Sequence, residues 1–122
     1  MSYDLAIRSG QLKQGGNGMR KITSDAVEAF VNGEEFRRDN TKVHSGLSNS
    51  IMYLHGHMIA SKEGNTVKIK DAGRQTKTTK ERLNGILDAY HGDSYIFQKD
   101  YQWYLSRHGE VEEFLSSKWI EI

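Results

Sequence analysis

The sequence predicts a single α+β domain in which a small, mostly antiparallel sheet carries an N-terminal helix and a second helix packed on the sheet. Two stretches, near residues 23–33 and 78–90, repeat apolar residues with the period of an amphipathic helix. Between and after them, short runs of β-branched and aromatic residues are separated by glycine-containing turns, as in antiparallel strands. The chain has 122 residues, enough for one hydrophobic core but not for two.

The N-terminal region divides into an arm and a helix. Residues 1–21 carry four glycines among polar side chains, so we expect a flexible arm there and a single domain over residues 22–122. In the first helix, Thr23 is the predicted N-cap, and the helix either stops at Asn32-Gly33 or adds a turn over residues 34–37. Its apolar face consists of Ala26, Val27, Phe30 and Val31.

Strand patterns begin after this helix. Residues 41–44 form a short candidate strand, and residues 51–55 and 58–61 lie on either side of Gly56. The latter two segments are either one bulged strand or two strands joined by a tight turn. A turn at Gly64 then leads into residues 66–70, whose strict alternation places Val67 and Ile69 inside the fold.

The second helix has a clear predicted start. Thr78 fits an N-cap, and Glu81 three positions later completes a capping box. We expect Arg82 and Asn84 to lie off the apolar stripe. The stripe itself consists of Leu83, Ile86, Leu87 and Tyr90.

Aromatic strands follow the second helix. Residues 95–99 and 101–105 form either a strand pair or one long bulged strand, and residues 119–122 offer a last strand that closes a sheet. Such an aromatic cluster more often belongs to a core than to a base-stacking platform, and alternation leaves only part of it at the surface.

Composition excludes several classes of protein and site. The net charge of +1 argues against a generic nucleic-acid binder, so nucleic acid is not the expected partner. There is no cysteine, which excludes disulfides and thiolate chemistry. No apolar run approaches the roughly 18 residues of a membrane helix, and we expect a cytoplasmic protein without a membrane partner. The hydrophobic share of 36% is low, which is consistent with burial completed in a homo-oligomer.

The charge is unevenly distributed. From Lys62 to Arg82 the chain carries seven Lys and Arg residues against three Asp and Glu residues, and from His108 to Ile122 it carries four Glu against Lys118. A basic middle and an acidic tail fit a ligand site with a solubilising end, or two faces of a self-assembling oligomer.

The candidate ligand site is the basic stretch 71–84. Cations around a helix N-terminus suit an anion such as a phosphate, and we predict contacts from Arg74, Thr78, Arg82 and Asn84. The same stretch also fits a plain helix start, in which the glycine permits a turn, the threonines cap and the cations are solvated.

Flanking residues extend this candidate site. His55 and His57 share one face of a strand, but no third ligand stands at a suggestive spacing for a metal site. We expect a glycine-enabled bend whose imidazoles hydrogen-bond to loops, line a pocket or contact phosphate. Tyr101 and Trp103 are the candidate stacking residues.

Signatures of catalysis are missing from the sequence. There is no Walker-type loop, no nucleophile elbow and no paired-carboxylate spacing. We therefore expect binding without turnover, with no cofactor and no metal. A phosphodiesterase using His55 and His57 is the less favoured enzymatic alternative.

Three segments together resemble a family of small bacteriophage proteins. Residues 53–60 contain a Leu-His-Gly-x-x-Ile-Ala strand, residues 71–84 an Ala-Gly turn and a Thr-x-Thr-Thr-x-x-Arg-Leu-Asn helix start, and residues 96–104 a Gln-Lys-x-x-x-Trp strand. Within about residues 37–105 the chain is similar to the anti-Thoeris sponges, phage proteins that sequester the cyclic ADP-ribose signal made by bacterial TIR-domain immune enzymes.

The resemblance implies an oligomeric binder with pockets between protomers, in which residue 74 stacks on a base and Asn84 makes polar contacts. The chain departs from the family at Arg74, where an aromatic residue is usual, and at Tyr101 and Trp103, where phosphate-binding cations are expected. A guanidinium stack or a different ligand, such as a cyclic oligonucleotide, would accommodate these changes.

The expected function is therefore sequestration of a phosphorylated nucleotide immune signal, without cleavage, to block bacterial antiphage defence. The alternative is a protein- or nucleic-acid-interaction module that inhibits a host enzyme by docking.

Overall fold

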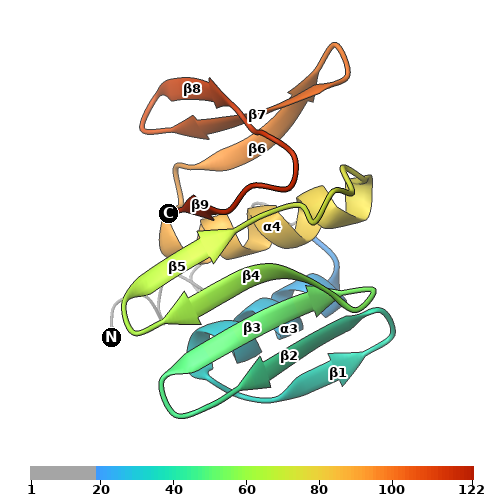
Figure 1. Cartoon of the computed structure of the whole chain (residues 1–122), viewed down its shortest axis with the longest axis vertical. Helices are drawn as coiled ribbons and strands as arrows, with labels where there is room; N and C mark the ends of the chain where they lie inside the picture. Colours follow the sequence, from blue (N-terminus) through green and yellow to red (C-terminus); the bar gives the residue numbers. More distant parts are fainter. Residues whose placement is uncertain (1–18) are drawn as a thin grey trace.

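A computed structural model describes residues 19–122, which form two helices and two antiparallel sheets (Figure 1). This is the α+β class expected from the sequence. The predicted flexible arm falls largely on residues 1–18, outside the described part of the chain. No helix within residues 19–122 is long and apolar enough to cross a bilayer.

The larger sheet has six strands in the order β1-β2-β3-β4-β5-β9, with α3 (Lys21–Asn32) behind it (Figure 1). Its first five strands form a meander in which each strand pairs with the next. The strands are β1 (Phe36–Arg38), β2 (Thr41–Ser45), β3 (Asn49–Leu54), β4 (His57–Glu63), β5 (Thr66–Ile69) and β9 (Ile120–Glu121).

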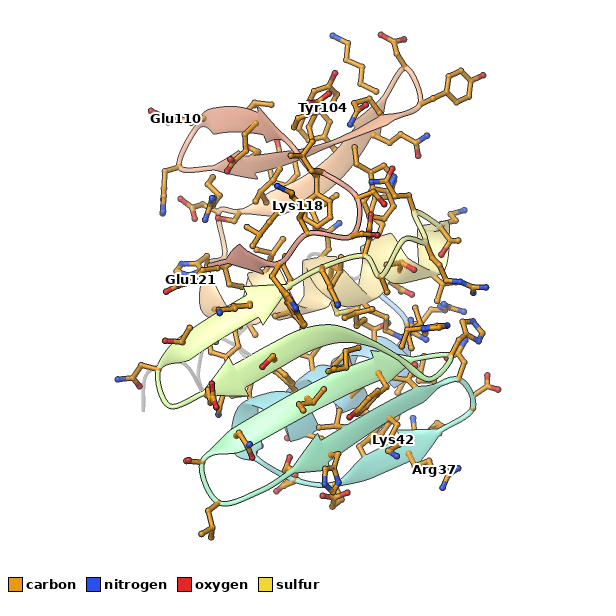
Figure 2. The ribbon with its side chains drawn as sticks, in the orientation of Figure 1. Arg37, Lys42, Tyr104, Glu110, Lys118 and Glu121 are labelled. Atoms are coloured by element: carbon orange, nitrogen blue, oxygen red, sulfur yellow. The ribbon has the colours of Figure 1, made fainter. Side chains whose placement is uncertain are left out.

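The smaller sheet consists of β6 (Tyr95–Lys99), β7 (Gln102–Arg107) and β8 (Glu110–Glu113), in that order. Helix α4 (Lys77–Tyr90) lies between the two sheets in the view of Figure 1 and contacts α3, β4 and β6. Figure 2 shows Arg37 and Lys42 on the larger sheet, and Tyr104 and Glu110 on the smaller one.

The sheet arrangement settles two alternatives and corrects one expectation. Residues 51–61 are two strands, because His55 (φ 53°) and Gly56 (φ 81°) form a tight turn between them. The aromatic segment is likewise a strand pair, turning at Asp100 and Tyr101, both with positive φ. The final strand does close a sheet by pairing β9 with β5. A single sheet was the wrong expectation, because β6–β7 pairs with β8 instead of joining the meander.

Strand β8 was not foreseen, and its composition explains why. Its residues, Glu-Val-Glu-Glu, are all exposed and show no apolar alternation, so they resembled a solvated acidic tail.

The start of α3 differs from the predicted one. Gly33, in the left-handed conformation with φ 73°, ends the helix as predicted. However, the helix begins at Lys21 and its N-cap position is Arg20, not Thr23. Thr23 is fully buried, and its hydroxyl accepts a hydrogen bond from Arg82 Nη1 at 2.7 Å. A long-range partner therefore takes the oxygen that local sequence assigned to capping.

The start of α4 also differs. The N-cap is Thr76, whose Oγ1 accepts a hydrogen bond from the Thr79 N–H at 3.1 Å, so the capping box at Thr78 is wrong. Glu81 does not reach back to the backbone of Thr78. Its carboxylate instead accepts from the backbone N–H of Arg20 at 2.7 Å and from Arg20 Nε at 3.0 Å.

Close approach of the two helices depends on Gly85. A Cβ at this position would lie 2.8 Å from Thr23 Cγ2 and 2.9 Å from Val27 Cγ2, closer than real side chains allow. The absent side chain lets α4 lie directly on α3. The core below them is formed by residues of both helices and of the sheets, including Phe30, Met52, Ile59, Ile86, Leu87, Trp103 and Phe114.

Candidate ligand-binding cleft

The eight residues predicted for a ligand site do not converge on one place. Arg74 is exposed in the loop before α4, His55 is exposed in the β3–β4 turn, and Tyr101 is 94% exposed at the tip of the β6–β7 hairpin. His57 lines a separate hollow of about 420 Å³ together with Lys70.

Trp103 lies in the core. It is 1% exposed, and its ring contacts Phe114 at a centroid distance of 5.8 Å. Alternation along β7 places Trp103 and Leu105 inward, while Tyr104 lies on the opposite face beside Phe97. In this conformation the indole of Trp103 is inaccessible to a stacking base.

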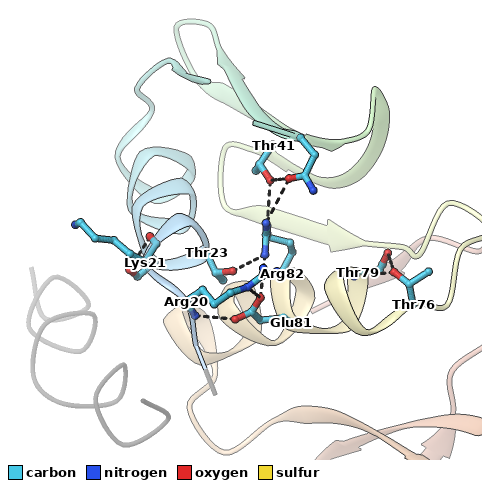
Figure 3. A network of polar contacts seen from close by, with 10 residues as sticks. Arg20, Lys21, Thr23, Thr41, Thr76, Thr79, Glu81 and Arg82 are labelled. Carbon is cyan, nitrogen blue, oxygen red and sulfur yellow. Dashed lines mark hydrogen bonds and ion pairs between the residues drawn. The ribbon is translucent and has the colours of Figure 1, made fainter. Parts of the chain in front are cut away.

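Arg82 was expected off the apolar stripe, and this is wrong, because it is 1% exposed. Its guanidinium donates to Thr41 Oγ1 at 3.1 Å, to Thr23 Oγ1 at 2.7 Å and to Glu81 Oε1 at 3.0 Å (Figure 3). A longer contact of 3.4 Å reaches Asn40 Oδ1. We call these five residues together with Arg20 the Arg82 network.

Electrostatics within the Arg82 network are balanced. Burial by itself raises the pKa of Glu81, but the two hydrogen bonds from Arg20 and the nearby charges of Arg20 and Arg82 hold that pKa below its ordinary value. Burial lowers the pKa of Arg82, and Glu81 opposes this effect. The network connects α3, α4 and β2, so its polar groups serve the fold.

Asn84 also makes structural hydrogen bonds. Its Nδ2 donates to the Ile96 carbonyl at 3.0 Å, and its Oδ1 accepts from the Ile96 N–H at 2.7 Å. The side chain thereby satisfies the free edge of β6 and attaches the smaller sheet to α4.

The loop before α4 is fixed by Asp71. This fully buried carboxylate accepts from the backbone N–H of Gly73 at 2.8 Å and of Ser117 at 2.7 Å, and from Gln75 Nε2 at 3.0 Å. It connects the loop to the C-terminal segment and leaves the Arg74 side chain in solvent.

A cleft of about 380 Å³ lies between α4 and the start of β6. We call it the α4–β6 cleft. Its α4 wall repeats at helical spacing, since positions 77, 80, 81, 84 and 88 fall on one face. Its lining residues are Met19, Lys77, Lys80, Glu81, Asn84, Asp88, Gly92, Ser94 and Tyr95.

One end of the α4–β6 cleft is cationic. Lys77 is exposed and Lys80 half-buried, and neither forms an ion pair within residues 19–122. The charge of Glu81 nearby is already shared by Arg20 and Arg82. A small adjoining hollow contains Thr78, Lys77, Glu81 and Arg20.

The other end holds polar atoms without partners. Asp88 Oδ2 and Ser94 Oγ are buried, and neither has a hydrogen-bond partner in the described part of the chain. Burial raises the pKa of Asp88 above its ordinary value. Tyr95 lies beside them with 51% of its surface exposed. Unsatisfied buried polar groups are uncommon in native proteins, so this end requires an explanation.

Of the predicted residues, only Asn84 lines the α4–β6 cleft and only Thr78 lines the adjoining hollow. Asp88, Ser94 and Tyr95 were missed as site residues. The spacing of Lys80, Asn84 and Asp88 at i, i+4 and i+8 was the available signal for the helix wall. No such signal existed for Ser94 and Tyr95, which reach the cleft through the turn after α4.

Metal binding finds no support in residues 19–122, where no group of three or more His, Asp or Glu side chains is placed to hold an ion.

Comparison with known proteins gives one finding. A family model described as Kyanoviridae Gp96 protein matches residues 19–121, which include both helices, both sheets and the α4–β6 cleft. No curated protein and no solved structure matches the chain.

Proposed function

The chain belongs to the Kyanoviridae Gp96 family of phage proteins, and from this premise we propose that it binds a phosphorylated nucleotide in the α4–β6 cleft and sequesters it without cleavage. The observation that carries the proposal is the polarity of the cleft. Unpaired cations lie at one end, and an exposed aromatic ring with unpartnered polar atoms lies at the other.

The phosphate end is formed by Lys77 and Lys80. Both lie in the first turn of α4 or directly after it, where the backbone N–H groups also favour an anion. Because neither lysine is neutralised within residues 19–122, a phosphate there would gain charge-assisted hydrogen bonds without breaking an existing pair.

The base end is formed by Tyr95 and Asp88. An exposed ring offers a stacking surface worth roughly 1–3 kcal/mol per base. Lys80 and Asp88 are eight residues apart, about 12 Å along the helix axis at 1.5 Å per residue. A ligand that reaches both ends must therefore be extended, with an anionic group at one end and a base at the other.

The lining of the cleft favours binding over turnover. It contains no histidine, and its two carboxylates are Glu81, which is held by Arg20 and Arg82, and Asp88, which has no hydrogen-bond partner among residues 19–122. Ser94 is 4% exposed, and no base of the described residues is hydrogen-bonded to its hydroxyl. An activated nucleophile needs such a base within hydrogen-bonding reach.

The finer proposal is a sponge for an immune signal such as a cyclic ADP-ribose isomer or a cyclic oligonucleotide, acting in the cytoplasm of the infected host. Its support is the motif resemblance to anti-Thoeris sponges and the phage family. Assembly into a homo-oligomer remains part of the proposal, and sedimentation of the purified protein tests it.

A second candidate function is docking on a host protein. The observation that favours it is a row of rings on the outer face of the smaller sheet. Tyr95 and Phe97 have ring centroids 5.8 Å apart, and Phe97 and Tyr104 are stacked at 5.5 Å. Tyr101 and Val111, both exposed, lie on the same sheet. Exposed apolar patches of this kind mark protein interfaces.

The deciding experiment is calorimetric titration of the purified full chain with cyclic ADP-ribose isomers and cyclic dinucleotides, followed by heat denaturation. Release of intact ligand supports a sponge, and release of altered ligand indicates an enzyme. If no nucleotide is retained, the proposal fails and docking is favoured.

A pair of lysine variants locates the site. Lys80→Glu should lower affinity at least tenfold, because it reverses a charge at the phosphate end. Lys99→Glu, on an exposed position of β6 outside the cleft lining, is the matched control and should bind like wild type. Equal affinities in the two variants would place the site elsewhere.

A further inference from the structure

We infer that the Asp88 end of the α4–β6 cleft receives the exocyclic amino group of a base, so that the protein selects amino-bearing bases. This inference rests on the proposed function and deepens it by naming the feature of the ligand that is read. It follows from two neighbouring residues of the lining, Asp88 on α4 and Ser94 in the turn before β6.

Asp88 is an acceptor without a donor. It is half-buried, and neither of its carboxylate oxygens receives a hydrogen bond within residues 19–122. The nearest cation of the cleft on the same row of α4 is Lys80, about 12 Å away along the axis, which is too far for an ion pair. The carboxylate thus requires a donor from outside the described chain.

Ser94 supplies a second polar atom at the same end. It is 4% exposed, and its Oγ has no hydrogen-bond partner in the described part of the chain, although its backbone is held by a 2.8 Å hydrogen bond from its N–H to the His91 carbonyl. Since a hydroxyl has two acceptor lone pairs and a rotatable proton, it adapts to either an N–H or an acceptor on the ligand.

An exocyclic amino group matches this pair of atoms. It carries two N–H donors in the plane of the base, one for the Asp88 carboxylate and one for the Ser94 hydroxyl. The ring that bears it would lie against Tyr95, whose exposed surface adjoins both residues in the cleft. Because Asp88 Oδ2 and Ser94 Oγ are buried, binding includes a rotation of the Asp88 carboxylate about its soft terminal torsion and a change of the Ser94 χ1 rotamer.

A metal ion is a poorer occupant. A cation would need several oxygen ligands, and among the described residues no group of three or more His, Asp or Glu surrounds this position.

The test compares two ligands that differ only in the amino group, adenosine 5′-monophosphate and purine riboside 5′-monophosphate. Calorimetric titration of wild type should show at least tenfold tighter binding of the amino compound. In Asp88→Ala this preference should vanish, through loss of affinity for adenosine 5′-monophosphate alone.

The matched control is Asp93→Ala, which removes a carboxylate five residues away that pairs with His108 outside the cleft. It should keep the preference of wild type. Thermal denaturation of both variants confirms that each is folded.

Three results would overturn the inference: equal binding of the two compounds by wild type, a preference that persists in Asp88→Ala, or no binding of either compound. Titration with the cyclic ADP-ribose isomers and cyclic dinucleotides then distinguishes failure of this inference from failure of the proposed function. If a cyclic nucleotide is retained, nucleotide binding is supported and only recognition of the amino group is contradicted. If none is retained, both are contradicted.

Discussion

Helix α4 carries two polar regions that differ in one respect. In the Arg82 network the buried guanidinium is hydrogen-bonded to two threonine hydroxyls, and its charge is matched by Glu81. At the Asp88 end of the cleft, six residues along the same helix, Asp88 Oδ2 and Ser94 Oγ are buried and find no hydrogen-bond partner within residues 19–122. The polar groups of the first region are thus paired with one another, whereas those two atoms of the second are not paired within the described residues.

This contrast is the reason to propose a structural role for one region and a binding role for the other. A buried group that is fully bonded stabilises one arrangement of the elements around it, and an unbonded one costs free energy that a ligand, an ion or an ordered water recovers. The sequence predicts Arg82 as one contact of a site over residues 71–84, because a cation near a helix start suits phosphate. In the structure Arg82 is bonded to Thr23, Thr41 and Glu81, while Lys77 and Lys80 form no ion pair within residues 19–122.

The largest expected effect comes from breaking the Arg82 network. Arg82→Ala should lower the free energy of unfolding by about 3–5 kcal/mol, because it removes the donor of two buried threonine hydroxyls and one of the two cationic partners of Glu81. Urea denaturation measures the change. The matched control, Arg74→Ala, removes an exposed guanidinium and should cost less than about 0.5 kcal/mol. Similar losses of unfolding free energy in the two variants would contradict the structural role of the Arg82 network.

Asn84 lies between the Arg82 network and the Asp88 end of the cleft, and we expect its side chain to stabilise the fold, as the Arg82 network does. Asn84→Ala removes both hydrogen bonds to Ile96 and should lower the free energy of unfolding by about 1–3 kcal/mol. Amide hydrogen exchange at Ile96 should accelerate as the edge of β6 loosens. In Gln98→Ala, which changes an exposed residue of β6, both quantities should stay near wild type. Unchanged exchange at Ile96 in Asn84→Ala would contradict this role.

Two threonines at the start of α4 also differ in whether their side chains are hydrogen-bonded, and here a smaller effect on stability is expected. Thr76 accepts a capping hydrogen bond and Thr78 has no side-chain hydrogen bond within residues 19–122. Thr76→Ala should therefore cost about 1 kcal/mol of unfolding free energy, and Thr78→Ala only a few tenths. Chemical denaturation of the pair measures both. A larger cost at Thr78 would restore the capping box predicted from the sequence.

The smallest effect, and the only stabilising one, is expected at Asp88. Burial raises the folded-state pKa of Asp88 above its ordinary value of 3.8, so the charged carboxylate destabilises the folded protein at any pH above the folded pKa. Asp88→Asn should raise the free energy of unfolding there by about 1 kcal/mol or less, discounted for partial exposure. This gain in unfolding free energy should shrink as the pH falls below the folded-state pKa, and it should disappear below the ordinary pKa of 3.8.

Denaturation at several pH values tests this sign. A gain that is independent of pH would mean that desolvation of the charge is not the cause. Asp93→Asn is the control, because Asp93 is exposed and already hydrogen-bonded to His108.

Much of the fold was accessible from local patterns. The alternation of residues 66–70 and the apolar stripe of residues 83–90 gave β5 and α4, because burial of one face has a short, regular period. The Gly33 stop was confirmed for the same local reason. Strand β8 and the division into two sheets were missed, since pairing partners of exposed strands leave no periodic trace.

The candidate site was less accessible. The sequence identified the basic stretch that supplies Lys77 and Lys80, and it identified Asn84, but it did not indicate Asp88, Ser94 or Tyr95 as a group. These three residues meet only because the turn after α4 brings β6 back along the helix. Ligand contacts from Arg74, Tyr101, His55 and His57 stay predictions, on surfaces outside the α4–β6 cleft.

Local sequence patterns were enough to predict where the helices and most strands lie and that cations gather at the start of α4, because each depends on residues close together in the chain. Tertiary structure alone decided which polar side chains are already bonded. Arg82 is hydrogen-bonded to Thr41 and Thr23, which are 41 and 59 residues away, whereas Asp88 has no donor among residues 19–122. Partners at such separations are set by how the elements pack, and local spacing carries no record of them.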